Sequence, residues 1–515
     1  MRILGILFVL FASTQVTLTS PCVQRSFGKG RIVCVCNATY CDDVEPTGSF
    51  SGANAVLFTS TEAGDRLLRS TAKFQPANSS AKIHVKIDAR QSFEEVIGFG
   101  GAFTDSTGIN AIELSDKARE QLLQSYFGEN AARYSLGRVP IGSTDFSLTQ
   151  YSYDEVEGDK ELEHFALHDA DHKYKLPLIK RALELTKSSG MKMYASPWAP
   201  PAWMKSSGKM SGGGYLKEEY KGAWARYFAK FFEAYAKEGV LFWAATLQNE
   251  PTSGAIPWYG WQTMYWNATG EREWARDFLS PTLKKSSVTK DIKLIALDDN
   301  RLWLPAWAES VYKDNKTADL FAGIGVHWYL DAYISASNLV KTHEKFPQKF
   351  ILASEASTGF SWPTRGPSLG DWSRAERYAN SIITDFNSHV SGWTDWNLAL
   401  DLKGGPTWAG NFVDSPVLVN ATADEFLKQP MFYALTHFSR FIRPGARRLL
   451  SAVTGSSALE VVAFSDPGDA STRILVVLNK GGEVDVSVED ANRNGTLLPL
   501  HVPAKSITTI LWRKQ

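Results

Sequence analysis

Two glutamates in this chain stand where a pair of carboxyl groups could hydrolyse an acetal. Glu250 follows the short apolar run Phe242–Thr246, and Glu355 follows the run Phe350–Ala353. Such hydrolysis uses one carboxylic acid to protonate the leaving oxygen and one carboxylate to meet the reacting carbon. A separation of about 5–5.5 Å between them predicts retention of configuration, and about 6.5–9.5 Å predicts inversion. A lone loop glutamate is more often a solvated charge, so the hypothesis requires a fold that brings both together.

Eight short apolar runs of strand type recur through the middle of the chain, separated by helical patterns. Ser115–Phe127, Leu176–Lys187 and Tyr220–Lys237 carry apolar residues at helical spacing. Eight strand–helix units predict a (β/α)8 barrel, whose chemistry lies where its strands end. Glu250 and Glu355 follow the fourth and seventh runs, on opposite sides of such a barrel mouth. The eight runs are Val96–Phe99, Tyr134–Val139, Met191–Ala195, Phe242–Thr246, Ile292–Ala296, Gly323–Val326, Phe350–Ala353 and Val390–Thr394.

Other residues able to do chemistry follow the same runs. Asn249 could hydrogen-bond a sugar hydroxyl, and His327 is expected as a hydrogen-bonded supporting residue rather than a base. Asp105, Asp298 and Asp299 have no metal-ligand spacing, so no metal site is predicted. Aromatic rings suit the flat faces of a sugar, but packing explains most tryptophans, so about two of five candidates are expected at a pocket. These candidates are Trp198, Trp328, Tyr329, Trp393 and Trp396.

Both ends of the chain have the pattern of β-structure without helices. Ala81–Ile87 alternates apolar and polar residues, and after Pro444 strand-like runs are separated by turn signals such as Gly481-Gly482. We expect a small β-sandwich built from both termini, with residues 51–95 and 445–515 as its two parts. The barrel is then inserted between these parts as residues 96–444.

The first twenty residues differ in composition from the rest. Arg2 is followed by the apolar run Ile3–Ala12 and then by small and polar residues up to Ser20. This order predicts a cleaved signal peptide over residues 1–20, since a signal anchor needs roughly 20 apolar residues. No second stretch has transmembrane length, so no transmembrane segment is expected in the mature chain.

All four cysteines, Cys22, Cys34, Cys36 and Cys41, lie within residues 21–50. Four cysteines allow three pairings, and a bridge between Cys34 and Cys36 is sterically poor. The simplest remaining choice joins Cys22 to Cys34 and Cys36 to Cys41. A zinc cluster is the alternative, which a secretory route disfavours. Once the cysteines pair, no thiol remains for catalysis.

Composition and sequons restrict the class of protein further. Lys plus Arg and Asp plus Glu are 55 each, so the formal net charge of 0 gives no overall field to hold nucleic acid. With 44% hydrophobic and 21% charged residues, the chain is not disordered as a whole. Six glycosylation acceptors fit a glycoprotein of the secretory or lysosomal route. They are Asn37, Asn78, Asn267, Asn315, Asn420 and Asn494.

Several longer segments, in order along the chain, match one known family. They are Val33–Cys41, Gly98–Gly101, Ala195–Trp198, Asn249–Pro251, Val326–Asp331, Ala353–Ala356, Gly392–Leu400, Asn411–Pro416 and Lys428–Tyr433. On these segments, residues 21–515 resemble the glucosylceramidases of glycoside hydrolase family 30. The resemblance implies a (β/α)8 barrel with a β-sandwich and a retaining reaction, in which Glu355 is the nucleophile and Glu250 the acid/base.

The resemblance also implies roles for the residues around these carboxyls. A glucose ring would be held by Asp145, Trp198, Asn249 and Trp396. Arg138 and Tyr329 would support the carboxylates, and Asn411 would lie at the pocket rim. The family pattern favours the sequential disulfide pairing and implies no cofactor.

The reaction that the resemblance implies is hydrolysis of glucosylceramide to glucose and ceramide at acidic pH, in a lysosome or after secretion. Because this lipid lies in membranes, a saposin-type activator and anionic lipid are implied as partners. The loop Phe360–Pro363 is a candidate for insertion at the membrane, with a buried loop as the alternative.

The chain departs from the family pattern at some places. The loop Thr252–Trp266 diverges from the family pattern. The sequence therefore predicts a preference for glucose more firmly than a preference for a particular lipid. Thr144 and Ser357 stand where relatives can carry free cysteines, which puts thiol sensitivity in doubt. Two rival functions remain open. One is a family 30 β-glycosidase for another sugar or glucan, and the other is a non-catalytic glycolipid-binding protein, which would not need the proton donor.

Overall fold

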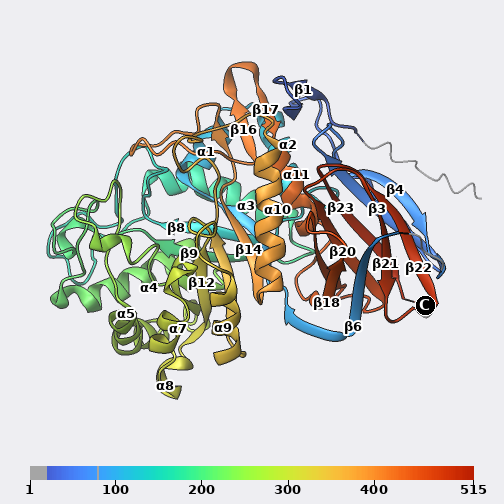
Figure 1. Ribbon diagram of the computed structural model, residues 1–515. Coiled ribbons are helices and arrows are strands. Elements are labelled where there is room, and N and C mark those ends of the chain that lie inside the picture. The colour runs from blue at the N-terminus through green and yellow to red at the C-terminus, as the bar shows by residue number, and fades with distance from the viewer. Residues whose placement is uncertain (1–19, 78–80, 494, 515) are drawn as a thin grey trace, which may run out of the picture.

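The computed structural model describes residues 20–77, 81–493 and 495–514. A barrel surrounded by helices lies beside a β-domain, on the left and right of Figure 1. The expected signal peptide lies outside the described residues except for Ser20, and Asn78 and Asn494 also lie outside them. Of the other candidate glycosylation sites, Asn267 and Asn315 are exposed, while those at 37 and 420 are half-buried.

Eight parallel strands close into a barrel in the order β10-β11-β12-β13-β14-β7-β8-β9. This is one strand for each expected apolar run, and the predicted barrel is confirmed. Every barrel strand except β10 ends later than expected, and two of them reach Asn300 and Asn397, which places Asp298 and Trp396 on strands instead of in loops. The barrel strands are β7 (Gly98–Ala102), β8 (Leu136–Ile141), β9 (Lys192–Pro197), β10 (Ala244–Thr246), β11 (Lys293–Asn300), β12 (Phe321–His327), β13 (Phe350–Glu355) and β14 (Val390–Asn397).

Helices cover the barrel, and those with one apolar face, such as α10, bury that face, whereas α11 is buried on all sides. Ser115 caps α2 by accepting the backbone N–H of Ala118. The helix α4 buries a row of aromatic residues that includes Trp224 and Phe228. The helices are α1 (Asp105–Ile112), α2 (Asp116–Phe127), α3 (Leu176–Leu185), α4 (Lys221–Lys237), α5 (Ala268–Trp274), α6 (Ser280–Leu283), α7 (Ala306–Val311), α8 (Asn315–Ala318), α9 (Ser337–Lys345), α10 (Trp372–Asn387) and α11 (Pro430–Ser439).

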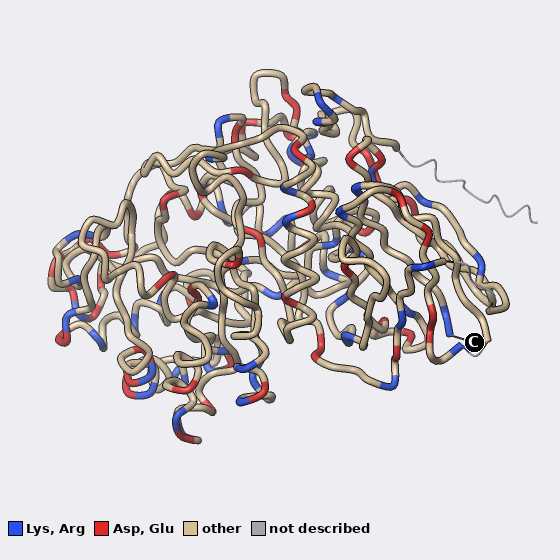
Figure 2. Tube along the Cα trace, in the orientation of Figure 1, with Lys and Arg blue, Asp and Glu red and all other residues tan. Residues whose placement is uncertain are grey.

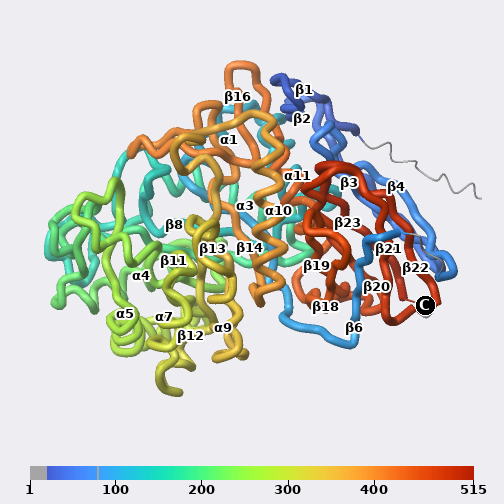
Figure 3. The backbone as a smooth tube through the Cα atoms, viewed as in Figure 1, coloured from blue at the N-terminus to red at the C-terminus, as the bar shows by residue number. Residues whose placement is uncertain are grey.

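The β-domain is one sheet of ten strands, in the order β4-β3-β23-β20-β19-β18-β6-β21-β22-β5. Strands from before the barrel pair with strands from after it, because β3 pairs with β23 and β6 lies between β18 and β21. Figure 3 shows these blue and red segments together. The prediction that both termini build this domain is confirmed. Its strands are β3 (Asn54–Thr61), β4 (Leu68–Lys73), β5 (Gln75–Pro76), β6 (Ile83–Glu95), β18 (Arg447–Thr454), β19 (Leu459–Ser465), β20 (Thr472–Asn479), β21 (Val484–Asp490), β22 (Thr496–Val502) and β23 (Ser506–Arg513).

A third sheet, which the sequence analysis does not predict, joins the N-terminal segment to the chain that follows β14. Its order is β1-β2-β17-β16-β15. Pairing of β2 with β17 brings Cys36 opposite Phe426, across most of the chain length. The strands are β1 (Gln24–Ser26), β2 (Ile32–Asn37), β15 (Leu400–Asp401), β16 (Val417–Asn420) and β17 (Glu425–Lys428).

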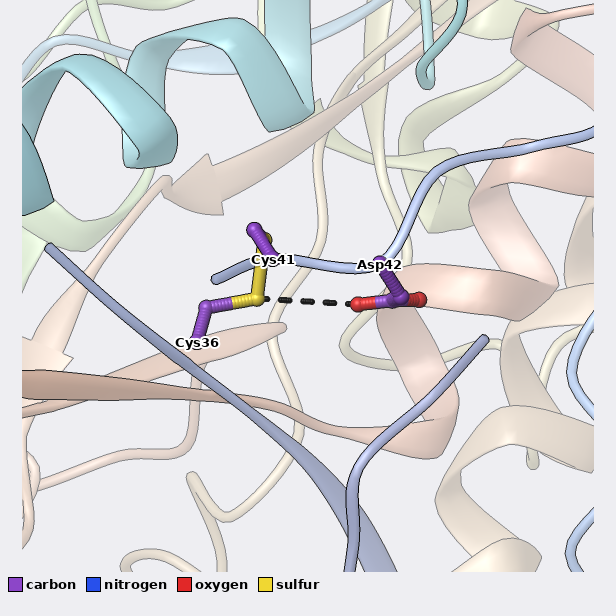
Figure 4. Close-up of side chains that lie close together, drawn as sticks. All are labelled: Cys36, Cys41 and Asp42. Carbon is purple, nitrogen blue, oxygen red and sulfur yellow. Dashed lines mark hydrogen bonds between the residues drawn. A yellow bond between two sulfur atoms is a disulfide. The ribbon is translucent and has the colours of Figure 1, made fainter. Parts of the chain in front are cut away.

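Disulfides close the N-terminal segment in the sequential pairing, Cys22 with Cys34 and Cys36 with Cys41. Figure 4 shows the second bridge beside Asp42, whose Oδ1 lies 3.6 Å from the Cys36 Sγ. Both sulfurs are bonded to each other, so the zinc alternative is wrong at this place. The Asp42 carboxylate is instead neutralised by Lys428, with 2.8 Å between Oδ1 and Nζ.

The distribution of charged residues and the hydropathy of the helices bear on possible partners. Lys and Arg alternate with Asp and Glu along both parts of the molecule (Figure 2), so neither part has a long stretch of one sign. Among the described helices, none is long and apolar enough to cross a membrane.

Candidate active site

Glu250 and Glu355 approach each other at the carboxyl end of the barrel strands. Glu355 is the last residue of β13, and Glu250 lies shortly after β10. One oxygen of each glutamate and one ring nitrogen of His327 all lie within 4.8 Å of one another. Carboxyl pairs of retaining glycosidases lie about 5–5.5 Å apart, and those of inverting enzymes about 6.5–9.5 Å. Because the nearest oxygens are within 4.8 Å, the spacing favours a retaining reaction over an inverting one.

The backbone at Glu250 adopts a left-handed conformation, with φ of 45°. A non-glycine residue pays a small energy for this conformation, which surrounding contacts must offset. The Glu250 N–H donates to the carbonyl of Asp298 at 2.9 Å. The Thr252 hydroxyl donates to Oδ2 of Asp299 at 2.6 Å. Strand β11 thus holds the turn that aims Glu250 into the barrel mouth.

Arg138 and Tyr329 both donate hydrogen bonds to Glu355. Arg138, fully buried on β8, donates to Oε2, and the Tyr329 hydroxyl donates to Oε1 at 2.6 Å. Arg138 also donates to Asp298 at 2.8 Å and to Oδ1 of Asn249 at 2.9 Å. Burial works against the Arg138 charge, but Asp298 and Glu355 outweigh it and raise the pKa of Arg138. The arginine therefore stays charged and stabilises an anionic Glu355.

The carboxyl group of Glu250 meets a different set of partners. The Tyr259 hydroxyl donates to Oε2 at 2.7 Å, and Nδ1 of His327 lies 3.4 Å from Oε1. Burial lowers the pKa of His327, but Glu355, Asp298 and Glu250 outweigh it and raise that pKa to about 10. Burial raises the pKa of Glu250. The hydrogen bond and positive charge of His327, together with the hydrogen bond from Tyr259, outweigh burial and bring this pKa below its ordinary value. An acid with this pKa holds its proton only at acidic pH.

A cavity of about 770 Å³ lies over the two glutamates. The expected sugar-binding residues all line it, namely Asp145, Trp198, Asn249, Trp396 and Asn411. The rings of Trp198 and Trp396 stack at 5.0 Å between centroids. Asn411 donates to Oδ2 of Asp145 at 2.8 Å. Burial raises the pKa of Asp145 to about 7; the Asn411 bond opposes this rise, and the Glu355 charge adds to it.

Three of the five aromatic candidates reach this cavity, Trp198, Tyr329 and Trp396, which is one more than expected. Trp328 and Trp393 are buried elsewhere, and both pack against Tyr378. Trp328 follows β12 and Trp393 lies on β14, and both pack outward on α10, which carries Tyr378. The pairing of β14 with β7 then shifts register between Thr394 and Asn397, so alternation counted from Trp393 does not by itself fix the direction of Trp396. The inward face of β14 carries Trp396.

Several other residues occupy places that the sequence analysis did not foresee. Asp105 lies in a separate buried cluster, with 3.5 Å between its carboxylate and Nζ of Lys175. Asp298, considered only as a metal ligand, is the common partner of Arg138 and His327 at 2.8 and 3.1 Å. Its position near the end of a barrel strand could have indicated this role. Tyr259 had no such signal, because it lies on an irregular loop.

Comparison with protein families follows the same division of the chain. The family domain described as "Glycosyl hydrolase family 30 TIM-barrel domain" matches this chain over residues 96–442. The description "Glycosyl hydrolase family 30 beta sandwich domain" matches residues 445–510. Both described domains therefore belong to one family, in the order found in this chain.

Individual proteins extend the likeness to the whole chain. Lysosomal acid glucosylceramidase of Mus musculus is 41% identical, covering 100% of this chain and 99% of its own length. The endo-1,6-beta-D-glucanase BGN16.3 of Trichoderma harzianum is 27% identical over 90% of this chain and 94% of its own. The crystal structure of SrfJ from Salmonella typhimurium superposes with a TM-score of 0.82 at 30% identity, covering 90% of this chain and 100% of its own. The chain is a glycoside hydrolase and belongs to glycoside hydrolase family 30.

Proposed function

We propose that this protein is a retaining β-glucosidase that hydrolyses glucosylceramide to glucose and ceramide. The observation that carries the proposal is the approach of Glu250 and Glu355 to within 4.8 Å beneath the cavity. The name of the mouse relative supports the choice of lipid. Apolar side chains on the outer wall of the cavity, including Ile256, Trp303 and Trp307, suit the hydrocarbon part of ceramide.

The reaction proceeds in two displacements at the anomeric carbon. Glu355 attacks this carbon while Glu250 gives its proton to the ceramide oxygen, so the glucosidic bond breaks and a glucosyl ester forms on Glu355. Glu250, now a carboxylate, then takes a proton from water, and the resulting attack releases glucose and restores Glu355. Arg138 and Tyr329 stabilise the Glu355 anion before attack and after release.

Glucose recognition in this proposal comes from the polar residues of the inner cavity. Asn249 uses its carbonyl oxygen to accept from Arg138, so its amide N–H groups are left for the hydroxyl beside the reacting carbon. Asp145 and Asn411, bonded to each other, bind hydroxyls further round the ring. The apolar faces of Trp198 and Trp396 supply flat surface for the sugar.

A substrate panel tests this function. Glucose or galactose release is measured at mildly acidic pH from vesicles that carry glucosylceramide or galactosylceramide, and from β-1,6-glucan. Glucosylceramide should be preferred over its galactose epimer by about 100-fold or more, because a site built for one hydroxyl leaves buried polar groups unpaired with the other. Preference for the glucan would support the rival glycosidase. No release by the folded protein would support a binding role.

Access to a membrane lipid requires a surface that meets the bilayer. Large apolar side chains are exposed on loops after several barrel strands: Trp258 and Tyr333 are each 83% exposed, and Trp362 is 87% exposed. Such a concentration around one mouth is typical of a membrane-binding face. We propose that this face rests on anionic lipid, with a saposin-type activator, in a lysosome reached through the secretory pathway.

Replacing Trp362 by alanine tests this membrane face. We expect hydrolysis of glucosylceramide in anionic vesicles to fall about threefold or more, since a tryptophan contributes strongly at a membrane interface. Hydrolysis of a soluble aryl β-glucoside should stay at the wild-type rate. Leu241→Ala is the matched control, because Leu241 is 67% exposed but precedes β10, at the opposite end of the barrel. Unchanged vesicle activity in Trp362→Ala would remove this loop from the membrane contact.

The organisation of the whole chain is proposed on the same basis. Residues 1–20 are a signal peptide and 21–50 a disulfide-bonded segment. Residues 51–95 and 445–515 form the β-sandwich around the catalytic barrel of 96–444. The two family matches, 96–442 and 445–510, support these boundaries.

A further inference from the structure

Tyr259 reaches Glu250 from the tip of a loop that has little support of its own. Its hydroxyl donates to Oε2 of Glu250 at 2.7 Å, while Trp258 and Gly260 on either side are exposed. The Tyr259 ring packs on Trp261 with 4.7 Å between centroids, but this contact stays within the same loop. Something outside the loop must therefore keep the hydroxyl in place.

A second loop, residues 205–216, holds this tip by backbone hydrogen bonds. The N–H of Gly212 donates to the carbonyl of Tyr259 at 3.1 Å, and that of Gly213 to the carbonyl of Pro257 at 3.3 Å. A Cβ at Gly213 would lie 2.8 Å from the carbonyl oxygen of Ile256, closer than real Cβ atoms come. Only glycine allows the two backbones to approach in this way.

Lys205 lies fully buried at the base of this second loop. Its Nζ donates to the carbonyls of Met210 at 2.8 Å and Gly212 at 2.5 Å, and lies 3.5 Å from that of Ser211. Burial lowers the pKa of Lys205 to about 8, with no contribution from a carboxylate of the described chain. A buried ammonium without a counterion is expensive, so its hydrogen bonds to successive carbonyls are what hold it there.

We propose that Lys205 is a positioning residue for Glu250. Its ammonium group fixes Gly212, Gly212 fixes the backbone of Tyr259, and Tyr259 donates the hydrogen bond that sets the acidity of Glu250. This inference deepens the proposed function and rests on the acid/base role of Glu250. It gives the loop of residues 205–216 a part in the reaction, although neither Lys205 nor Gly212 lines the cavity.

The sign of the effect separates this role from a general structural one. Burial raises the pKa of Glu250, and His327 followed by the Tyr259 hydrogen bond lowers it. Loss of the tyrosine bond therefore raises the pKa of Glu250. Because the reaction needs a proton on Glu250, the alkaline limb of the kcat/KM profile then moves to higher pH. A loop that only stabilised the fold would lower activity without moving this limb.

The test compares Lys205→Met, Tyr259→Phe and the double variant. The kcat/KM profile is measured on a short alkyl β-glucoside, whose alkoxide leaving group needs a proton. We expect each single change to move the alkaline limb upward by about half a pH unit or more. The alkaline limb of the double variant should lie at the same pH as that of Tyr259→Phe. Both changes disrupt the same hydrogen bond, from Tyr259 to Glu250, so their effects should not add.

Lys209→Met is the matched control, since Lys209 is an exposed lysine of the same loop. The alkaline limb of its kcat/KM profile should lie at the same pH as in the wild type. If Lys205→Met does not fold, Gly213→Ala supplies a second route, because its Cβ pushes the loops apart. Additive shifts in the double variant, or lower activity with an unmoved limb, would overturn the proposal. An alkaline limb that persists in Glu250→Gln would instead overturn the acid/base assignment.

Discussion

Glu355→Gln is expected to lower kcat for glucoside hydrolysis by about three orders of magnitude or more, because an amide cannot attack the anomeric carbon. The loss should be alike for every leaving group, since the glucosyl ester cannot form. Folding should survive the change, because Arg138 keeps its 2.8 Å ion pair with Asp298. The measurement is kcat on glucosylceramide vesicles and on an aryl β-glucoside, with the melting temperature as a check of folding.

A chemical trap makes this result specific to one residue. A 2-fluoro-2-deoxy-β-glucoside with a good leaving group forms a slow glucosyl ester in retaining enzymes, and mass spectrometry should locate it on the peptide that contains Glu355. Glu309→Gln is the control, because Glu309 is a half-exposed glutamate paired with Lys345 on the barrel exterior and should keep wild-type activity. Retention of more than about a tenth of the rate in Glu355→Gln would make the nucleophile assignment wrong.

The barrel and its two glutamates could be predicted because the signals are local. Each strand is a short apolar run, each helix has its own periodicity, and a barrel places the ends of its strands at one mouth. Glu250 and Glu355 come within four residues of the end of two such runs. The β-sandwich was predictable for the same reason, since alternation and turn residues at both ends of the chain mark strands without helices.

The contacts that set the chemistry could not be predicted, because they depend on register and on distant pairing. Asp298 meets Arg138 only when the barrel has closed, and it lies at a register shift of β11 between Leu297 and Asp299, where the backbone is left-handed. The sheet that joins β2 to β17 depends on strands almost four hundred positions apart. Local sequence patterns carry no information about the Asp298–Arg138 contact or about the pairing of β2 with β17.

Charge at the site was the least predictable property. A pair of close carboxyls by itself would raise the pKa of one member. Here His327, held positive by Asp298 and both glutamates, reverses that direction at Glu250. Nothing in the sequence indicated that the pKa of His327, the last residue of β12, would rise to about 10. The acidity of Glu250 is thus set by the folded arrangement of the side chains around it, His327 and Tyr259 above all.

Glu250→Gln is expected to separate substrates by their leaving groups. For an alkyl glucoside or glucosylceramide, kcat/KM should fall by about 100-fold to 10,000-fold, because the departing alkoxide needs a proton. For dinitrophenyl β-glucoside, whose phenolate leaves without one, the first step should stay close to the wild-type rate. The second step then lacks its base, so added azide should restore turnover by attacking the glucosyl ester and releasing glucosyl azide.

The pH profile of the same variant completes the argument. His327 and Tyr259 hold the pKa of Glu250 below its ordinary value, which is about 4.3 for a free glutamate. Activity on an alkyl glucoside needs the protonated form, so the wild type should lose activity as pH rises through the acidic range, and Glu250→Gln should lack this alkaline limb. Equal losses on alkyl and dinitrophenyl substrates, or a limb that survives the change, would place the proton donor on another residue. Asp145, whose pKa is raised to about 7 in the same cavity, would then be the group to test.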